Sequence, residues 1–440
     1  MTYTTFCLAC IAFLAADCLG AGNSWPQWRG PDSQGVSSEE GLPTEWSRTK
    51  NVSWLTPIPG RGHSSPIVSG NRIFVTTAVE GPVVPEARAV RHVTKDGKEF
   101  SHPDSIGADH LQTLKLLCLD LETGKILWER TAHQGTVQDN RHRKNTFASP
   151  TPITDGKNVY AYFGSEGIYA FDFEGKPLWK ASLGLIATMG MGVASSPALY
   201  GNLLILQCDQ DNGVGSFIAA VGKSSGKLAW KTSRNTLESW SSPIVVNHEG
   251  RPELIVAARE VIISYDPETG KEYWRANGVG ANPAPTPVAG YGSVFVTAGA
   301  QKKRTVAIRL GGSGDISNSS KILWRHDRGA PHVPSPLLYR DYFYLMTDNG
   351  LLTCLDAHTG EMKYQGARPP GPATFSASPV AFEDKIVLSS EDGDSYVVKA
   401  GPTYELLSTN SIGEPIYASP AIAGGRILIR GEKNLFCIRK

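Results

Sequence analysis

A three-residue motif recurs through almost the whole chain at nearly constant spacing. It consists of a small residue, a serine and a proline, or a close variant of that triplet. Its prolines are Pro66, Pro150, Pro197, Pro243, Pro287, Pro336, Pro379 and Pro420. From Pro150 onward, successive prolines lie 41 to 49 residues apart, and the longer first step leaves room for an insertion. A period of this length, repeated eight times, is typical of the blades of a β-propeller.

A typical repeat contains a short β-rich run, a second strand that ends near the position held by Asp120 in the first repeat, a tight turn and an outer strand. In residues 119–128, Asp120 precedes a Thr-Gly turn and Trp128 follows in the next strand. An aspartate accepts hydrogen bonds from the N–H groups of such a turn, and Gly124 supplies the positive φ that it needs. We expect the outer aromatic residue to dock between adjacent blades. The docking residues are Trp128, Trp179, Trp230, Trp274, Trp324 and Tyr364.

The eighth repeat lacks an outer strand of its own before Lys440. Residues 51–56 precede the first motif and carry Trp54 in a strand-like run that belongs to no other repeat. We expect this strand to complete the last blade, because closing the ring removes two open sheet edges. The sequence therefore predicts an all-β fold, an eight-bladed β-propeller of four-stranded antiparallel blades, closed by an N-terminal strand.

Three regions follow from this pattern. Residues 1–22 hold a short apolar run followed by small residues, which predicts a secretory signal peptide and export to the periplasm or the exterior, without a lipid anchor. Residues 23–45 form an N-terminal extension, and residues 46–440 form the propeller, with an insertion at about 80–114 in the first blade. We expect no transmembrane span and a monomer. The net charge of +1 excludes a nucleic-acid binder that relies on a basic surface.

The repeats resemble a known family. The Asp-x-x-Thr-Gly-Lys-x-x-Trp unit at residues 120–128 is similar to the tryptophan-docking repeat of quinoprotein-like propellers, which include pyrroloquinoline quinone (PQQ) alcohol dehydrogenases and BamB-like outer-membrane assembly factors. Residues 25–31, 142–150 and 238–243 resemble segments of secreted PQQ-like propellers of the planctomycete type. The resemblance implies the fold and three functions: a binding scaffold, a PQQ-dependent oxidoreductase, or a BamB-like assembly factor.

The residues favour a protein without a cofactor, with PQQ and Ca²⁺ as the alternative. In the PQQ enzymes a pair of adjacent cysteines packs on the quinone, and long inserts cover it; this chain has neither feature. Cys118, Cys354 and Cys437 occupy equivalent positions in different repeats, so we expect reduced core residues. Residues 209–213 resemble the start of a calcium loop but lack the glutamate at its twelfth position, which predicts a hairpin turn.

The insertion and the segments that lead into the repeats hold the site candidates. His92, His102 and His110 of the insertion, and His133 beyond it, have spacings that match no standard metal site, so the insertion is predicted to be a surface loop or a partner-binding lid. Polar and aromatic residues before the motifs are expected to gather at one mouth of the ring, either to bind a ligand or to satisfy the inner-strand backbone. They are Arg61, His63, Lys144, Asn145, Trp240, Asn282, His332, Phe375 and Tyr417.

We therefore predict a non-catalytic binding or scaffold propeller. Its partner would be an envelope or extracellular protein, or a small polar or anionic ligand, recognised at the mouth and the first-blade insertion. The rival predictions are the PQQ oxidoreductase and the BamB-like assembly factor. We expect no catalytic residue and no metal ligand.

Overall fold

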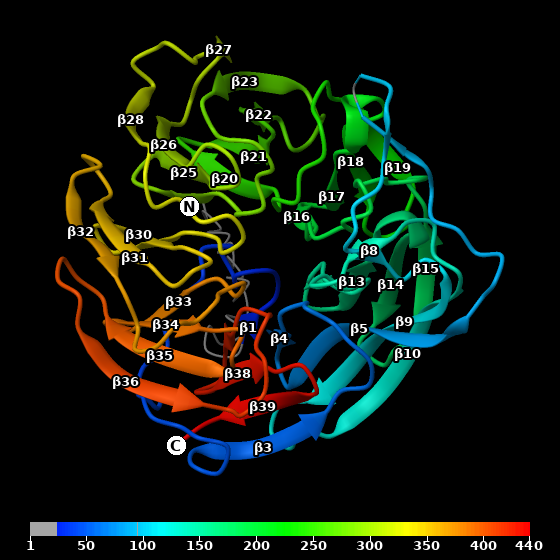
Figure 1. Ribbon diagram of the computed structural model, residues 1–440, viewed down its shortest axis with the longest axis horizontal. Helices are drawn as coiled ribbons and strands as arrows, with labels where there is room; N and C mark the ends of the chain where they lie inside the picture. Colours follow the sequence, from blue (N-terminus) through cyan, green and yellow to red (C-terminus); the bar gives the residue numbers. More distant parts are fainter. Residues whose placement is uncertain (1–23, 95) are drawn as a thin grey trace, which may run out of the picture.

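Eight small β-sheets stand around a common axis in the computed structural model, which describes residues 24–94 and 96–440 (Figure 1). Each sheet is one blade, and its first strand lies nearest the axis. The predicted signal peptide lies outside the described residues. Within the described part of the chain, no helix is long and apolar enough to cross a membrane.

Four blades have the simple form of four antiparallel strands in chain order. Blade 2 comprises β12 (Ile153–Thr154), β13 (Asn158–Tyr162), β14 (Ile168–Asp172) and β15 (Pro177–Ala181); blade 3 comprises β16 (Ala198–Tyr200), β17 (Leu203–Cys208), β18 (Phe217–Gly222) and β19 (Leu228–Ser233). Blade 5 comprises β24 (Val288–Gly290), β25 (Ser293–Ala298), β26 (Arg304–Arg309) and β28 (Ile322–His326); blade 6 comprises β29 (Leu337–Tyr339), β30 (Tyr342–Met346), β31 (Leu352–Asp356) and β32 (Met362–Ala367). The predicted repeat is therefore one blade.

Three blades carry a fifth strand. Blade 1 comprises β4 (Ile67–Ser69), β5 (Arg72–Val83), β9 (His110–Asp120) and β10 (Ile126–Gly135), with β1 (Ser24–Trp25) on its inner edge. Blade 7 comprises β33 (Val380–Phe382), β34 (Lys385–Ser389), β35 (Asp394–Lys399) and β36 (Leu406–Ser411), with β2 (Val36–Ser37) parallel to its inner strand. Blade 4 comprises β20 (Ile244–His248), β21 (Arg251–Ala258), β22 (Val261–Tyr265) and β23 (Glu272–Asn277), with β27 (Gly314–Asp315) on its outer edge.

Blade 8 closes the ring as the sequence predicts. It comprises β37 (Ala421–Ile422), β38 (Ile427–Arg430) and β39 (Asn434–Ile438), and its outer strand is β3 (Val52–Pro57) from the beginning of the chain. Trp54 pairs with Cys437 in this antiparallel ladder. The eight-bladed, all-β fold with an N-terminal closing strand is confirmed.

The tight turns between the two outermost repeat strands of the blades receive the outer tryptophans of their neighbours. Asp120 accepts hydrogen bonds from the N–H and the hydroxyl of Thr123, both at 2.8 Å, which fixes the turn. A Cβ atom added to Gly124, whose φ is +70°, would lie 2.5 Å from the ring of Trp54. The tryptophans donate their indole N–H to backbone carbonyls of the next blade: Trp54 to Leu121, Trp128 to Phe173, Trp179 to Lys223, Trp230 to Pro267 and Trp324 to Ala357.

Trp274 of blade 4 is held differently. Its indole N–H donates to the Glu253 carboxylate of its own blade at 2.6 Å, and the ring is fully buried. Glu253 is also buried, and it accepts hydrogen bonds from Ser264 and from the backbone N–H of Gly311. Burial alone would raise the pKa of Glu253, but these donors and Arg251 lower it below its usual value. The segment around residues 311–320 is therefore fastened to a buried carboxylate.

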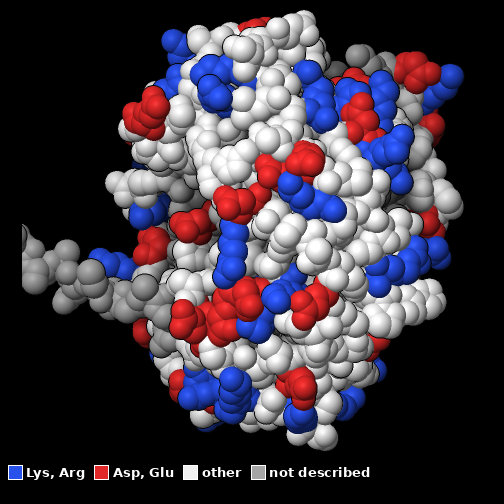
Figure 2. Space-filling model, turned by 90° about the vertical axis from the view of Figure 1, so that its left-hand side faces the viewer, with Lys and Arg blue, Asp and Glu red and all other residues white. Residues whose placement is uncertain are grey.

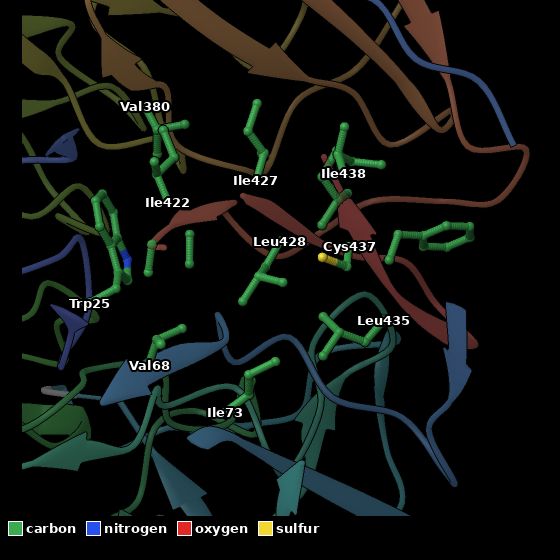
Figure 3. Close-up of a cluster of buried hydrophobic side chains, with 14 of the residues drawn as sticks. Trp25, Val68, Ile73, Val380, Ile422, Ile427, Leu428, Leu435, Cys437 and Ile438 are labelled. Carbon is green, nitrogen blue, oxygen red and sulfur yellow. The ribbon is translucent and has the colours of Figure 1, made fainter. Parts of the chain in front are cut away.

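The N-terminal extension enters the middle of the ring and fills the end opposite the mouth. We call residues 24–41 the N-terminal plug. Trp25 is 1% exposed and belongs to a buried cluster with strands of blades 1, 7 and 8; Figure 3 shows its ring near Ile422 and Val68. Arg29, 2% exposed, donates to the carbonyl oxygens of Gln34 and Pro336. The plug thus links blades on opposite sides of the axis.

Further hydrogen bonds join the plug to the ring. They run from the indole N–H of Trp28 to the Thr286 hydroxyl, from the Thr154 N–H to the Pro26 carbonyl, from the Ala289 N–H to the Gln34 side chain, and from the Gly424 and Gly425 N–H groups to the Glu39 carboxylate. Since these partners belong to blades 5, 2, 5 and 8, the plug crosses most of the ring.

Figure 2 shows the side of the ring that lies at the left of Figure 1. Acidic and basic side chains are interspersed on this face, with no large area of one sign. This distribution agrees with the net charge of +1 and gives no reason to place an electrostatic partner there.

Candidate functional site: the mouth and the first-blade insertion

The mouth is the end of the ring where each chain segment leads into an inner strand, away from the plug. A shallow recess opens there between blades 1 and 8. It is lined by Arg61, Gly62, His63, Tyr417, Ala418, Arg430, Gly431 and Glu432. Three of the predicted candidates, Arg61, His63 and Tyr417, therefore meet in one place.

Arg430 forms the floor of this recess and was not among the sequence candidates. It is 2% exposed, and one guanidinium N–H group donates to the carbonyl and the hydroxyl of Ser64, at 3.0 and 2.6 Å. No carboxylate of the described residues forms an ion pair with it, and burial lowers its pKa to about 9. Arg430 is therefore a buried cation at neutral pH. Sequence analysis did not identify Arg430 as a site residue, because it ends an otherwise apolar strand whose residues are expected to belong to the core.

His63 stacks on Tyr417, with ring centroids 4.5 Å apart and an angle of 21° between the planes. Burial, followed by the charges of Arg430 and Arg61, lowers the pKa of His63 to about 3. The imidazole is consequently neutral at physiological pH. The recess then presents a neutral aromatic pair beside two arginines, of which Arg61 lies 3.8 Å from the carboxylate of Glu432.

Lys144 reaches from the loop before blade 2 to blade 7. Its ammonium group lies 2.9 Å from the Glu391 carboxylate, which also accepts hydrogen bonds from the hydroxyls of Ser376 and Thr374. The Lys144 side chain is 59% exposed, whereas that of Glu391 is 12% exposed. The pair bridges non-adjacent blades across the mouth and leaves the lysine accessible.

Three other candidates hold loops in place. The Asn145 side chain donates to the carbonyl of Met191 at 2.8 Å. The indole N–H of Trp240 donates to the carbonyl of Gly192 at 2.9 Å. Asn282, with φ of +52°, accepts a hydrogen bond from Arg259 at 3.2 Å. These contacts join the loops of neighbouring blades near the mouth.

The remaining two candidates lie apart from the recess. His332 is exposed, and its backbone N–H donates to the Asp348 carboxylate. Phe375 is 1% exposed in the core of blades 6 and 7, where its ring lies 6.2 Å from that of Tyr396. The ring of Phe375 offers no surface to a ligand.

The first-blade insertion folds over the loops of blades 2 and 3. Its short strands β6 (His92–Val93) and β7 (Glu99–Phe100) pair with each other, and β8 (Ser105–Ile106) pairs with β11 (Arg141–His142) before blade 2. Two 3₁₀ turns, η1 (Gly164–Glu166) and η2 (Asp211–Gly213), lie in the loops of blades 2 and 3. The insertion is therefore an ordered platform beside the mouth.

His92 fixes this platform. Its two ring nitrogens lie 2.8 Å from Asp139 and 2.9 Å from Asp211, and all three side chains are less than one-tenth exposed. Burial alone would lower the pKa of His92, but the hydrogen bonds to Asp139 and Asp211 raise it to about 9. The imidazolium form donates from both nitrogens. One buried cation therefore joins blade 1 to blades 2 and 3.

A small hollow of about 30 Å³ lies between the loops that lead into blades 2 and 3, with room for about one water molecule. It is lined by Asp139, Asn140, Thr146, Phe147, Pro150, Phe163, Gly164, Ser165, Glu166, Ile186, Thr188, Gly192 and Val193. Burial raises the pKa of Glu166 in this wall. A volume of this size accommodates water and not an organic ligand.

His102, Asp104 and His142 converge at the base of the insertion. One possible ligand atom from each lies within 4.8 Å of the others, and all three residues are half-buried. The predicted spacings missed this group because His142 lies in the loop before blade 2. Only the pairing of β8 with β11 brings it beside the insertion.

Calcium-bound PQQ is the cofactor alternative for the mouth. Calcium takes six to eight oxygen ligands, mostly carboxylates and carbonyls. The nearby carboxylates of Glu391 and Glu432 already face Lys144 and Arg61. The four cysteines of the described residues are buried at separate positions in the blades, and burial raises the pKa of Cys118 to about 12. A chain without PQQ and Ca²⁺ therefore stays a prediction.

Comparisons with known proteins agree with the fold. The family model described as outer membrane protein assembly factor BamB matches residues 111–233 and 214–373, more than half of the 440-residue chain. No curated protein sequence matches the chain.

Two solved structures are similar over most of the chain. BamB from Moraxella catarrhalis is 12% identical with a TM-score of 0.53, over 88% of this chain and 98% of that one. The computationally designed Ika8 protein is 12% identical with a TM-score of 0.55, over 82% and 100% of the two chains. At these identities the structural likeness shows the fold alone, whereas the family match goes further: the chain belongs to the PQQ-like propeller family described as outer membrane protein assembly factor BamB.

Proposed function

We propose that this chain is an exported scaffold propeller that binds a protein of the cell envelope through its mouth and its first-blade insertion. The observation that carries the proposal is the fixed platform made by the insertion. A buried His92 between two aspartates holds about thirty residues of extra chain beside the mouth. Long loops in compact domains are commonly functional, and a rigid one can bind without a large ordering cost.

The plugged end of the ring supports the proposal that the partner binds at the mouth. Trp25 and Arg29 of the N-terminal plug are buried there, so their side chains offer no binding surface. At the mouth, by contrast, Lys144 and Arg61 keep 59% and 41% of their side-chain surface exposed. A partner that approaches the mouth can contact the platform and these cations together.

The family description favours an outer-membrane assembly protein as the partner class. On this proposal the chain supplies a recognition surface and no chemistry. Its location would be the periplasm, which agrees with the predicted signal peptide.

A capture experiment with a matched pair of variants tests the proposal. Lys144 at the mouth and Lys50 at the opposite end are 59% and 60% exposed, and each pairs with one glutamate. Immobilised wild-type protein should retain a specific protein from an envelope extract of the source cells. The Lys144→Glu variant should lose it, and the Lys50→Glu variant should keep it. Equal retention by both variants would contradict recognition at the mouth.

A second assay addresses the oxidoreductase alternative directly. PQQ and Ca²⁺ are added to the purified protein, and quinone absorbance and dye reduction with alcohols or sugars are measured. We expect neither stoichiometric uptake nor turnover. Uptake of one quinone per chain together with substrate oxidation would overturn the scaffold function.

A further inference from the structure

The group formed by His102, Asp104 and His142 carries an inference beyond the binding function. Two imidazoles and one carboxylate are donors that first-row divalent metals accept, and zinc takes such sets with tetrahedral geometry. The candidate ligand atoms lie within 4.8 Å of one another. Among the described residues, no other histidine, cysteine and carboxylate group converges in this way.

The backbone fixes the relative position of the three side chains. β8 pairs with β11, with Ser105 opposite His142, so the residue after Asp104 is tied to one of the histidines. The N–H of Arg143 also donates to the backbone carbonyl of Asp104 at 2.8 Å. The group is therefore preorganised by main-chain bonds from two segments, which is what a metal site requires.

The hydrogen bonds also show which atoms face the metal position. The Nδ1 atoms of His102 and His142 accept hydrogen bonds from backbone N–H groups, at 3.1 and 3.2 Å. Nε2 of His142 lies 3.5 Å from Oδ2 of Asp104, while Arg143 contacts the other carboxylate oxygen at 3.1 Å. The two Nε2 atoms and Oδ2 are therefore the donors turned toward one another.

We propose that His102, Asp104 and His142 bind one zinc ion that clamps the first-blade insertion to the strand before blade 2. Each neutral ring carries its proton on Nε2 while Nδ1 accepts a hydrogen bond. On metal binding each Nε2 proton passes to Nδ1, and two N–metal bonds and one O–metal bond form. The backbone N–H groups of Asp104 and Lys144 then turn from Nδ1 to water. Water fills the fourth position. Zinc binding at this site does not depend on the identity of the partner that binds the platform.

Calorimetric titration of the chelator-treated full chain with zinc chloride tests this site. We expect one zinc ion per chain with micromolar affinity or better. His102→Ala and His142→Ala should each lower the affinity by more than the roughly 10- to 100-fold that outer-shell partners contribute. His110→Ala is the matched control, because His110 also pairs with one aspartate and is 29% exposed, against 30% for His142. It should bind zinc as the wild type does.

Two further readouts keep the test decisive if a variant folds poorly. Asp104→Asn keeps the size of the side chain and should weaken zinc binding while the unfolding midpoint in EDTA stays at the wild-type value. Zinc should slow proteolysis within residues 84–108 of the wild type and leave the His142→Ala pattern unchanged. Absence of zinc uptake by the wild type, or equal uptake by the double variant His102→Ala/His142→Ala, would overturn the proposal.

Discussion

The two ends of the ring are built in opposite ways. At the plugged end, Trp25 and Arg29 are 1% and 2% exposed. Trp25 packs against strands of blades 1, 7 and 8, and Arg29 donates to the Pro336 carbonyl of blade 6. At the mouth, Lys144 is 59% exposed and its ion pair spans the opening. Burial of the Trp25 ring stabilises the fold, whereas exposed ion pairs contribute little to stability. On the proposed function, the plugged end serves stability and the mouth serves recognition.

The largest expected effect lies at the plugged end. Trp25→Ala removes a fully buried indole, which costs about 3–5 kcal/mol of unfolding free energy in typical cores. Denaturant unfolding followed by tryptophan fluorescence and circular dichroism measures it. If Trp25→Ala lowered the unfolding free energy by no more than Lys144→Ala does, the contrast between a stabilising plugged end and an exposed mouth would be contradicted.

His92 is an exception to this contrast between the two ends, because it is a buried, stabilising group on the mouth side. His92→Ala leaves Asp139 and Asp211 without their shared cation, and removing one partner of a buried pair costs about 3–5 kcal/mol. The loss should appear in the platform, since the blades keep their own cores. Hydrogen exchange should therefore speed up within residues 84–108 and stay unchanged in blades 5 and 6. Uniform acceleration over the ring would refute a local role for His92.

His92 and His63 should give the stability of the protein opposite pH dependences. The pKa of His92 is raised from 6.5 to about 9, so its contribution is complete below pH 6.5 and is lost as the pH rises through 9. The pKa of His63 is lowered from 6.5 to about 3, so protonation of the unfolded chain removes stability as the pH falls from 6.5 toward 3. Histidine NMR titrations of the wild type and the two alanine variants separate the signals. A His92 that titrates near 6.5 would show that the aspartate pair does not hold it.

The smallest effect is expected at the mouth. Lys144→Ala removes an exposed partner of one ion pair and should cost less than about 1 kcal/mol of unfolding free energy. The same variant should reduce partner capture strongly. If it destabilised the protein as much as Trp25→Ala, the bridge across the mouth would be structural.

The ring was predictable because its information is local and repeated. Most blades carry an outer aromatic residue, and four carry the turn aspartate, at Asp120, Asp172, Asp266 and Asp356. Trp54 lies in a strand-like run that belongs to no neighbouring repeat. Even so, the repeat concealed one variation: Trp274 bonds to Glu253 of its own blade, whereas Trp230 bonds to the next one. The repeat pattern predicts that this residue is aromatic. It does not predict its hydrogen-bond partner, the Glu253 carboxylate, which also accepts a hydrogen bond from Gly311 in the segment after β26.

The sites were less predictable because they depend on pairings distant in sequence. The plug binds through strands of two residues each, which have too little periodicity to be recognised. Arg430 lies in an apolar strand, and Asp211 lies in what the sequence predicts as a polar turn. Three-dimensional packing alone shows that Arg430 meets His63 and that Asp211 meets His92.

Site-specific photo-crosslinking at the two ends tests the central claim most directly. A photoreactive residue is placed at Arg143, whose side chain is 66% exposed beside the mouth, or at exposed Glu40 on the plugged end. After ultraviolet irradiation in the source cells, adducts with an envelope protein are identified by mass spectrometry. Recognition at the mouth predicts a specific adduct from position 143 and none from position 40. A specific adduct from position 40 alone would place the partner at the opposite end and contradict the account.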